Sequence, residues 1–480
     1  MSVLSADVTS FDQLQEKLRA HGQEHLLAFW DELDDAGRGQ LAGQINNIDF
    51  DLVASLFRGE VEQPDWAALS AKAEPPPAVR LADRKANAKS GLGFTPEEAK
   101  LRGKSALATG EMGVLLVAGG QGSRLGFEKP KSLYPIGPLS EATLLQIHIE
   151  KVRALSRQYG KPIPLYLMTS PVTHEDTVEF VEKHHRFGLT EDDLVIFCQG
   201  TMPAVDDKKG KVLMSAKDEL FLSPNGHGGT VAALADSGAI EHMHRHGVKQ
   251  LFYFQVDNPL APICDEELIG SHLLAESELT SLTIAKQTPE EKLGNFVLVD
   301  DALHVIEYSD FPESIAQQQG ADGGLKFWAG SIAIHVFDVA FLERSLKLKD
   351  SLPFHTAHKQ ASFLDESGKL LEPEEKNALK FERFIFDLLP QAKRPIVVEF
   401  AEREVFAPLK NAPGAPKDTP KYVQQYLLDQ HRRWLTAAGA KVADGVDVEI
   451  SPLVAHDAAA VAKLVEAGQE FNESQYLSEA

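Results

Sequence analysis

Apolar positions along the chain change their spacing several times, and these changes predict the order of helices and strands. From about residue 9 to 75, apolar side chains recur every three or four positions, as at Phe11, Leu14 and Leu18, which is the pattern of amphipathic helices. From 113 to about 400, short apolar runs rich in β-branched residues alternate with helical patterns. Such runs are typical of parallel strands, which are buried on both faces. A helical N-terminal lobe followed by an α/β region is therefore expected.

The alternation between 113 and 400 predicts a doubly wound, mostly parallel sheet, in which ligands bind beyond the carboxyl ends of the strands. Phe296–Val299 and Leu303–Tyr308, separated by a turn at Asp300-Asp301, predict an inserted hairpin. The expected strands of the sheet are 113–118, 165–168, 194–197, 251–254, 282–285, 332–334 and 396–398. The expected helices are 143–159, 173–185, 230–246, 265–277 and 381–389.

Changes of pattern and proline clusters divide the chain into three expected domains. These are a helical lobe at 1–95, an α/β catalytic domain at 96–400 and a small C-terminal α+β domain at 401–480. Pro75-Pro76-Pro77 reads as a linker or rigid edge, and Pro413-Gly414-Ala415-Pro416 marks a boundary before a helix and a short strand. The length of 480 residues fits two or three domains.

Charge and cysteine content narrow the possible partners. With 48 Lys and Arg against 71 Asp and Glu, the net charge is −23, which argues against nucleic acid or an anionic membrane as a partner. Two cysteines exclude a disulfide scaffold. The first residues lack the pattern of a signal peptide, and no apolar run reaches membrane-spanning length. A cytoplasmic protein is expected, and its oligomeric state stays open.

The stretch from Met112 to Lys131 predicts a polyphosphate-binding loop. An apolar run at Val114–Ala118 leads into the glycine-rich segment Gly119–Gly126, where the backbone turns sharply and its N–H groups approach an anion. Arg124 and Lys131 add two positive charges. The glycine spacing fits neither the dinucleotide fingerprint nor the P-loop, which argues against a nicotinamide dehydrogenase. The alternative is a glycine turn with surface charges.

A carboxylate closes another expected strand. Asp257 follows the apolar run 251–256, and a carboxylate there faces the ligand crevice and suits Mg²⁺ that carries phosphate oxygens. The alternative is a cap for the turn at Asn258-Pro259. Weaker candidates follow other runs, and each alone reads as a loop or surface residue: Gln199, the turn Gly226–Gly229 with His227, Gly294, Asn295, Glu307 and Lys410.

Several of these motifs, taken in order, resemble the eukaryotic-type UDP-sugar pyrophosphorylases, and most closely their UDP-N-acetylglucosamine pyrophosphorylase branch. Residues 119–131, GGQGSRLGFEKPK, resemble the GGxGTRLGxxxPK signature, with Ser123 in the Thr position. The likeness runs over nearly the whole length, and it includes Gln199-Gly200, Val256-Asp257-Asn258, Glu307-Tyr308-Ser309 and Pro408-Leu409-Lys410-Asn411. The resemblance implies the Rossmann-like nucleotide-diphospho-sugar transferase fold.

The resemblance also implies a reaction, in which UTP and a sugar 1-phosphate give a UDP-sugar and pyrophosphate with Mg²⁺. The attack on the α-phosphorus is in line, so such a site mainly positions anions and neutralises their charge. Arg124, Lys131 and Lys410 would be catalytic, and Asp257 would hold the metal. By the same resemblance the nucleotide site would comprise Ala118, Gly119, Gly120, Lys131, Gln199 and Gly226. The sugar site would comprise His227, Gly294, Asn295, Glu307, Trp328 and Ser331, with Gly226 beside it.

The chain departs from the family pattern where the sugar is recognised. His227 stands where the N-acetylglucosamine branch has Asn, and a Gly-His-Gly turn is more like the UDP-glucose branch. The segment resembling FNAGNI reads FWAGSI, so that Trp328 and Ser331 replace both asparagines. N-acetylglucosamine 1-phosphate is the expected substrate, and glucose 1-phosphate is the alternative. A sugar-nucleotide-binding regulator without activity is a further alternative.

Overall fold

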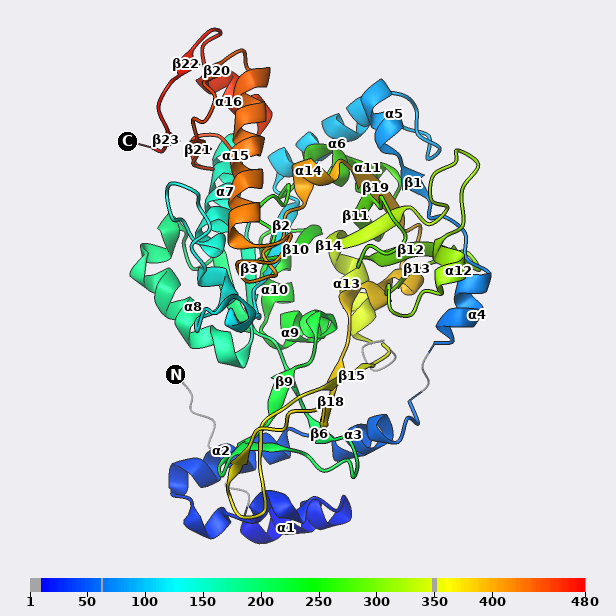
Figure 1. The fold of residues 1–480 in the computed structure, drawn as a ribbon, viewed down its shortest axis with the longest axis vertical. Coiled ribbons are helices and arrows are strands. Elements are labelled where there is room, and N and C mark those ends of the chain that lie inside the picture. The colour runs from blue at the N-terminus through cyan, green and yellow to red at the C-terminus, as the bar shows by residue number, and fades with distance from the viewer. Residues whose placement is uncertain (1–9, 62–63, 348–351, 480) are drawn as a thin grey trace. The chain divides into compact units, whose positions relative to one another are not determined.

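The structure, a computed structural model, describes residues 10–61, 64–347 and 352–479. The described residues divide into two compact units (Figure 1). Unit 1 takes those within Met1–Pro64, Gly200–Gly229 and Ser351–Ile385, and unit 2 takes those within Asp65–Gln199, Thr230–Asp350 and Phe386–Ala480. Each unit therefore combines segments that are far apart in the sequence. The three sequential domains remain a prediction about independent folding, which is a different property from compactness.

Unit 2 is built on a large, mostly parallel sheet, as expected from the apolar runs. Among the described residues ten strands form it, in the order β1-β19-β11-β14-β10-β2-β3-β4 with β12 and β13 attached at β14. Neighbouring strands of this order are parallel except at β14, which runs antiparallel to both β10 and β11. The bounds are β1 Ala78–Val79, β2 Met112–Val117, β3 Leu165–Thr169, β4 Leu194–Cys198, β10 Gln250–Gln255, β11 Leu279–Ala285, β14 Ala329–Asp338 and β19 Ile396–Phe400.

The predicted hairpin is confirmed as β12 (Gly294–Val299) and β13 (Ala302–Ile306). Asp300 and Asp301 at its turn both have positive φ, 49° and 67°, as a type I′ turn requires. The hairpin joins the main sheet through two residue pairs, Gly294 with Ser331 and Asn295 with Gly330.

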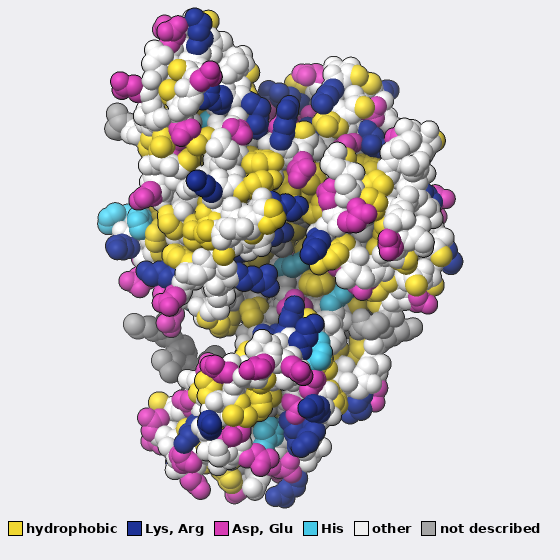
Figure 2. Space-filling model, viewed as in Figure 1, with side chains coloured by type: hydrophobic (Ala, Val, Ile, Leu, Met, Phe, Trp, Pro, Cys, Tyr) yellow, Lys and Arg dark blue, Asp and Glu magenta, His cyan; other side chains and the backbone are white. Residues whose placement is uncertain are grey.

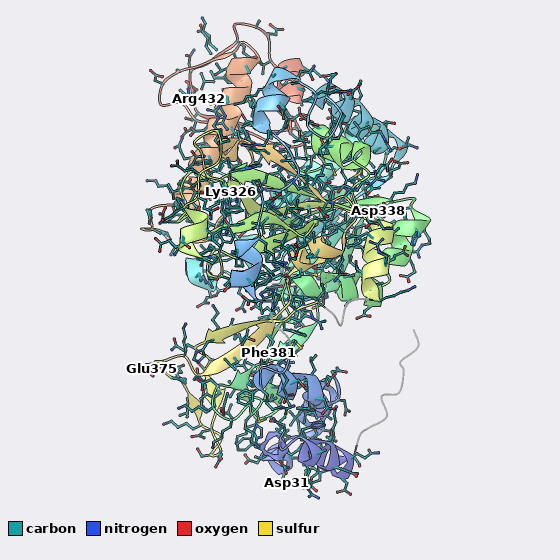
Figure 3. The ribbon with its side chains drawn as sticks, turned by 90° about the vertical axis from the view of Figure 1, so that its right-hand side faces the viewer. Asp31, Lys326, Asp338, Glu375, Phe381 and Arg432 are labelled. Carbon is teal, nitrogen blue, oxygen red and sulfur yellow. The ribbon has the colours of Figure 1, made fainter. Side chains whose placement is uncertain are left out.

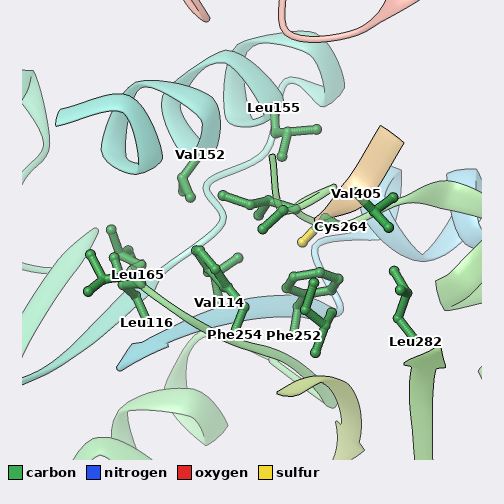
Figure 4. Close-up of a cluster of buried hydrophobic side chains, with 14 of the residues drawn as sticks. Val114, Leu116, Val152, Leu155, Leu165, Phe252, Phe254, Cys264, Leu282 and Val405 are labelled. Carbon is green, nitrogen blue, oxygen red and sulfur yellow. The ribbon is translucent and has the colours of Figure 1, made fainter. Parts of the chain in front are cut away.

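Helices cover the sheet of unit 2 (Figure 1). Thr95 and Glu98 form the capping box that starts α6, in agreement with the Thr-Pro-Glu-Glu sequence at that point. The core between sheet and helices includes Val114, Phe252 and Leu282, all fully buried (Figure 4). The helices are α4 Trp66–Ala71, α5 Leu81–Ala86, α6 Pro96–Thr109, α7 Leu144–Tyr159, α8 Pro171–Lys183, α9 Thr230–Asp236, α10 Ala239–Arg245, α11 Glu266–Leu274, α12 Glu313–Ala316, α13 Val339–Leu346, α14 Glu402–Val405, α15 Pro420–Ala437 and α16 Ala458–Leu464.

Two predicted helices differ from the structure. The single helix expected over 230–246 is divided into α9 and α10, because Gly238 between them has φ +74°. The helix expected over 381–389 is wrong in its first part, where Phe381 lies in strand β18 (Ala378–Glu382), and a 3₁₀ helix follows at Ile385–Gln391.

The last part of unit 2 packs against the sheet region through α15. Arg432 of α15 donates hydrogen bonds to the carbonyls of Val442, Ala443 and Val446, which holds the loop that follows the helix (Figure 3). The buried Glu449 carboxylate accepts from the N–H groups of Leu139 (2.6 Å) and Ser140 (2.7 Å). The short strands here are β20 Lys441–Val442, β21 Val448–Ile450, β22 Glu470–Phe471 and β23 Gln475–Leu477.

Unit 1 combines the N-terminal helices with strands from two later segments. Helices α1 (Phe11–Ala20), α2 (Asp35–Asn46) and α3 (Phe50–Phe57) share a core with Phe381 of β18, which Figure 3 labels. The other strands of unit 1 are β5 Thr201–Pro203, β6 Val205–Asp206, β7 Met214–Ala216, β8 Glu219–Leu220, β9 Leu222–Pro224, β15 His355–Lys359, β16 Phe363–Leu364 and β17 Leu370–Leu371. In the described parts of both units, no helix has the length and apolar character needed to span a bilayer.

Candidate active site

The glycine loop that follows β2 folds back on itself. Lys131 donates its N–H to the carbonyl of Gly120 at 3.0 Å, and Gly122 donates to the carbonyl of Lys129 at the same distance. A Cβ on Gly122 would lie 2.7 Å from the carbonyl oxygen of Phe127, so only glycine fits this position. In the described part of the chain, the N–H groups of Gly119, Gly120 and Gln121 have no hydrogen-bond acceptor. Three consecutive N–H groups in a glycine loop suit an anion.

The carboxyl ends of β3 and β4 meet the same loop. Ser170 donates its hydroxyl to the carbonyl of Gly119 at 2.8 Å, and the N–H of Gln199 donates to the carbonyl of Thr169 at 2.9 Å. A Cβ on Gly119 would lie 3.4 Å from Oε1 of Gln199. The Gln199 amide, which is buried, therefore lies against the glycine backbone, as the nucleotide-site prediction requires.

Asp257, just after β10, meets Lys131. The Lys131 Nζ is 3.6 Å from the Asp257 Oδ2, and the two side chains are 21% and 14% exposed. Leu409 donates its N–H to the Asp257 carbonyl at 2.8 Å, which brings the segment before Lys410 to the same place. The carboxyl ends of β2 and β10 thus bring together residues that the sequence predicted to act on phosphate and metal.

Asp257 is suited to a metal that arrives with its substrate. Among the described residues, it belongs to no group of three or more ligating side chains. Mg²⁺ is commonly held by one or two carboxylates, with substrate phosphates and water completing the octahedron. A single carboxylate beside anion-binding N–H groups fits that coordination, and it does not fit a cation held by protein ligands alone.

Lys410 is exposed, and its Nζ lies 5.7 Å from the centre of the Phe406 ring. Burial raises the pKa of the neighbouring Asp418 carboxyl; Lys417 and Lys410 oppose the rise, and Asp257 adds to it. The charges of Lys410 and Asp257 therefore both affect the pKa of the Asp418 carboxyl. Arg124 is exposed on the 3₁₀ turn Ser123–Leu125. On the face in Figure 2, basic side chains are interspersed with acidic ones, and several border a hollow in unit 2.

Three of the predicted sugar residues gather at the inserted hairpin. Gly294 of β12 pairs with Ser331 of β14. A Cβ on Gly294 would lie 3.2 Å from Oε1 of Glu307 and 3.7 Å from Cβ of Ser331. The nearest atom to that Cβ would be Cγ1 of Val305 at 2.6 Å, so glycine is required for close packing here, with the Glu307 carboxylate and Ser331 nearby.

Asn295 and Trp328 make other contacts. The Asn295 amide is buried; its Oδ1 accepts from Nζ of Lys286 at 2.8 Å, and its Nδ2 donates to the Ile306 carbonyl. Because side chains alternate along a strand, it points to the opposite face from Gly294. The Trp328 ring is buried under the Arg80 guanidinium, which lies 3.8 Å from the ring centre. The contacts of both side chains are packing and hydrogen bonds within unit 2.

Gly226 and His227 belong to unit 1. Gly226 has φ +80°, and a Cβ there would lie 2.3 Å from the Arg383 carbonyl oxygen. The N–H groups of Gly228 and Gly229 are not available to a ligand, because they donate to the carbonyls of Arg383 (2.7 Å) and Gly226 (3.1 Å). The glycines here permit close packing of two backbone segments.

The His227 ring is held in one tautomer. Ile385 donates its N–H to His227 Nδ1 at 3.0 Å, so in the neutral ring Nε2 carries the proton. Burial, reinforced by the charge of His355, lowers the pKa of His227 to about 4. The His227 ring is therefore neutral near pH 7, with its proton on Nε2.

Lys286, which the sequence did not suggest as a site residue, contacts the predicted sugar residue Asn295. It directly follows β11, is 6% exposed and holds Asn295, and burial lowers its pKa. The available signal was a lysine at the carboxyl end of an apolar run. Its position there matches that of Asp257 after β10.

A family model described as UTP–glucose-1-phosphate uridylyltransferase matches residues 72–479. The chain belongs to this family. Among curated relatives, UDP-N-acetylhexosamine pyrophosphorylase-like protein 1 of Homo sapiens is 33% identical over 503 residues and covers 98% of both chains. The UDP-N-acetylglucosamine pyrophosphorylase of Saccharomyces cerevisiae is 36% identical over 73% of this chain and 75% of its own length.

Two solved structures of related proteins align with most of this chain. The uridine diphosphate N-acetylglucosamine pyrophosphorylase of Trypanosoma brucei aligns with a TM-score of 0.81 and 25% identity over 96% of both chains. A putative UDP-N-acetylglucosamine pyrophosphorylase of Entamoeba histolytica aligns with a TM-score of 0.75 and 29% identity, over 85% of this chain and 100% of that one. The predicted α/β fold with a mostly parallel sheet is confirmed by the sheet of unit 2 and by these alignments.

Proposed function

We propose that this member of the UTP–glucose-1-phosphate uridylyltransferase family transfers a uridylyl group from UTP to N-acetylglucosamine 1-phosphate. The products are UDP-N-acetylglucosamine and pyrophosphate. One observation carries the proposal: Lys131 and Asp257 meet at the carboxyl ends of β2 and β10, beside three consecutive N–H groups of the glycine loop. Phosphoryl and nucleotidyl transfer depend mainly on positioning and charge neutralisation, and these groups supply both.

In the proposed complex the nucleotide lies along the glycine loop. Gly119 and Gly120, which follow Ala118, approach the uridine and its phosphates, and the Gln199 amide pairs with the donor and acceptor edge of uracil. Lys131 and Lys410 neutralise the phosphate oxygens, and Arg124 holds the leaving pyrophosphate. Asp257 binds Mg²⁺, which when present neutralises charge on the phosphates.

The sugar is expected at the hairpin, and a role for His227 in binding it stays a prediction. Glu307 and Ser331, which lie near Gly294, carry oxygen atoms suited to sugar hydroxyls. Relatives named for N-acetylglucosamine favour that sugar as the acceptor. The Gly-His-Gly turn with its fixed tautomer keeps glucose 1-phosphate as the second candidate. Roles for Gly226, Asn295 and Trp328 at the sugar or nucleotide remain predictions.

A pyrophosphate-release assay tests the proposal. The purified chain is supplied with UTP, Mg²⁺ and, in turn, the 1-phosphates of N-acetylglucosamine, N-acetylgalactosamine, glucose and galactose. The highest kcat/KM is expected for N-acetylglucosamine 1-phosphate. Preference for glucose 1-phosphate would replace the substrate assignment, and no turnover with any sugar would refute the activity.

The two cysteines bear on the compartment. Cys198 and Cys264 are both free thiols in the structure, one exposed and one buried. Free thiols fit a reducing compartment, and we propose the cytoplasm.

A further inference from the structure

A second cluster of ligating side chains lies in unit 2, at the opposite edge of the sheet from Lys131 and Asp257. Asp192 precedes β4, and His242 and His246, on α10 and at its end, precede β10. One ligand atom from each of these three side chains lies within 4.8 Å of the others. Since β4 and β10 run in the same direction, the cluster is at their amino ends. Six residues of strand, about 20 Å, separate it from the carboxyl edge.

His242 is the fixed member of this cluster. The residue is 6% exposed, and its Nδ1 lies 2.9 Å from the hydroxyl of Tyr166 on β3. Its Nε2 is buried and has no hydrogen-bond partner among the described residues; the nearest carboxylate oxygen, on Asp192, is 3.9 Å away. Buried ring nitrogens almost always have a partner, so this one needs an explanation.

A bound cation supplies that explanation. If Nδ1 donates its proton to the Tyr166 oxygen, Nε2 has a free lone pair, and Oδ1 of Asp192 is 3.9 Å away; the His246 ring, stacked on that of His242, would have to turn to present a nitrogen to the same cation. A metal-bound histidine usually has this arrangement, in which the second nitrogen donates to an outer partner that fixes the ring.

The other two proposed ligands, Asp192 and His246, are exposed and can move toward a cation. His246 is four residues after His242, hence on the same side of the helix, and the two rings stack with centres 4.1 Å apart. In a tetrahedral zinc site with ligand distances of about 2.1 Å, donor atoms lie roughly 3.4 Å apart. The 3.9 Å from His242 to Asp192 needs about half an ångström of movement, and both Asp192 and His246 are exposed.

Neighbouring charges act in both directions. Asp192 and Asp193 contribute negative charge at His242, whereas Arg245 and His246 oppose a positive charge there. Two imidazoles and one carboxylate form a set that Zn²⁺ binds well and that Mg²⁺, which prefers oxygen ligands, does not.

We propose that Asp192, His242 and His246 bind a divalent transition-metal cation of the Zn²⁺ type, with water in the remaining position. The ion joins the end of α10 to the loop before β4, and so clamps the amino edge of the sheet. The site is structural, because it lies at the other edge from the candidate active site. It does not depend on the proposed transferase activity.

Calorimetric titration of the full chain with ZnCl₂, after removal of metals by a chelator and with Mg²⁺ in excess, tests the site. One Zn²⁺ per chain is expected, with at least tenfold weaker binding in the His246→Gln and Asp192→Asn variants. Both side chains are exposed, so these variants keep the core intact. His244→Gln is the matched control: it lies on the same helix, is exposed, and contacts Glu343 at 2.7 Å outside the cluster.

A second readout separates binding at this site from binding elsewhere, for example at the exposed thiol of Cys198. Zn²⁺ at 100 times its Kd should raise the Tm of the wild-type chain and of His244→Gln by roughly 3–5 °C, and should leave that of His246→Gln unchanged. Unaltered affinity in both ligand variants, or the absence of one-to-one binding in the wild type, would overturn the proposal. Loss of transferase activity in any variant has no bearing on it.

Discussion

Replacing Lys131 by Met tests the candidate active site directly, because the chain offers a matched control two residues away. Lys131 is partly buried beside Asp257, whereas Lys129 is an exposed lysine of the same loop. The loop uses only backbone atoms of Lys129, whose carbonyl accepts from Gly122. Lys131→Met removes a positive charge from the predicted phosphate site. Lys129→Met removes a positive charge from the solvent-exposed surface of the same loop.

The size of the effect follows from the geometry. The Lys131 Nζ is 3.6 Å from a carboxylate oxygen. At an effective dielectric constant of about 20, a unit charge at that distance contributes roughly 5 kcal/mol before desolvation is counted. A phosphate oxygen bound by Lys131 would interact at a similar distance, and part of this energy is lost in removing water. Loss of one positioned donor typically costs ~10²–10³ in rate, or about 3–4 kcal/mol, so a fall of that size in kcat/KM is expected.

Initial rates of pyrophosphate release with saturating Mg²⁺ provide the measurement, and the unfolding transition of each variant checks the fold. The free energy of unfolding should fall by only about 1 kcal/mol, since water partly solvates the Lys131–Asp257 pair. Lys129→Met should stay within about twofold of the wild-type kcat/KM, as is usual for a surface substitution. Equal losses in the two variants, or nearly normal activity of Lys131→Met, would refute the reasoning.

Three further changes test other parts of the chain. Asp257→Asn should lower kcat/KM ~10²-fold and raise the Mg²⁺ concentration needed for half-maximal rate, measured by Mg²⁺ titration; an unchanged Mg²⁺ dependence would contradict its metal role. Glu449→Gln should lower the free energy of unfolding by about 2–3 kcal/mol in urea, because the carboxylate accepts two N–H groups from Leu139 and Ser140. Burial lowers the pKa of Lys151 to about 8, against about 10.4 in the unfolded chain, so above pH 8 the unfolded state binds more protons and this group's contribution to stability rises with pH. Urea denaturation at several pH values should show a smaller rise for Lys151→Met, and an identical pH profile would argue against the shift.

Much of the central sheet was predictable from the sequence because its strands are buried on both faces. Such strands appear as continuous apolar runs, and β2, β3, β4, β10, β11 and β19 were found in this way. The wrong predictions concern a strand with only one buried face and a helix end that depends on a single backbone angle. Phe381 in β18 is buried while its neighbour Lys380 is half-buried, a two-residue pattern too short to distinguish from a helix. Gly238 ends α9 through its positive φ, which spacing of apolar residues does not reveal.

The assembly of unit 1 lay beyond the sequence for a different reason. Its small sheet pairs Val205 with Leu379, so its hydrogen bonds join two segments of unit 1 that are separated in the sequence by a long stretch of unit 2. Local sequence patterns do not reveal pairings between distant segments, whereas the βα alternation of unit 2 makes neighbouring strands predictable.

The candidate site was predictable to the extent that it follows strand ends. Lys131 and Asp257 come after β2 and β10, and the rule that ligands bind beyond the carboxyl ends of parallel strands places them together. Lys410 is different, because its position depends on the hydrogen bond from the Leu409 N–H to the Asp257 carbonyl. Trp328 was expected at the sugar, and its packing under Arg80 depends on a pairing across the sheet that the sequence does not display.

The arrangement of unit 2 separates uridylyl transfer from sugar choice. Lys131 and Asp257 follow two adjacent central strands, β2 and β10, which pair with each other over all six residues and also pair with β3 and β14 over four residues each. The hairpin that carries Gly294 joins the same sheet through only two residue pairs, one of them with Ser331. Changes on the hairpin or at Ser331 can therefore alter the region proposed to bind the sugar while β2 and β10 keep their register. The departures from the family pattern at Trp328 and Ser331 follow this division, since the glycine loop departs from its signature only by Ser123, a hydroxyl side chain in place of Thr.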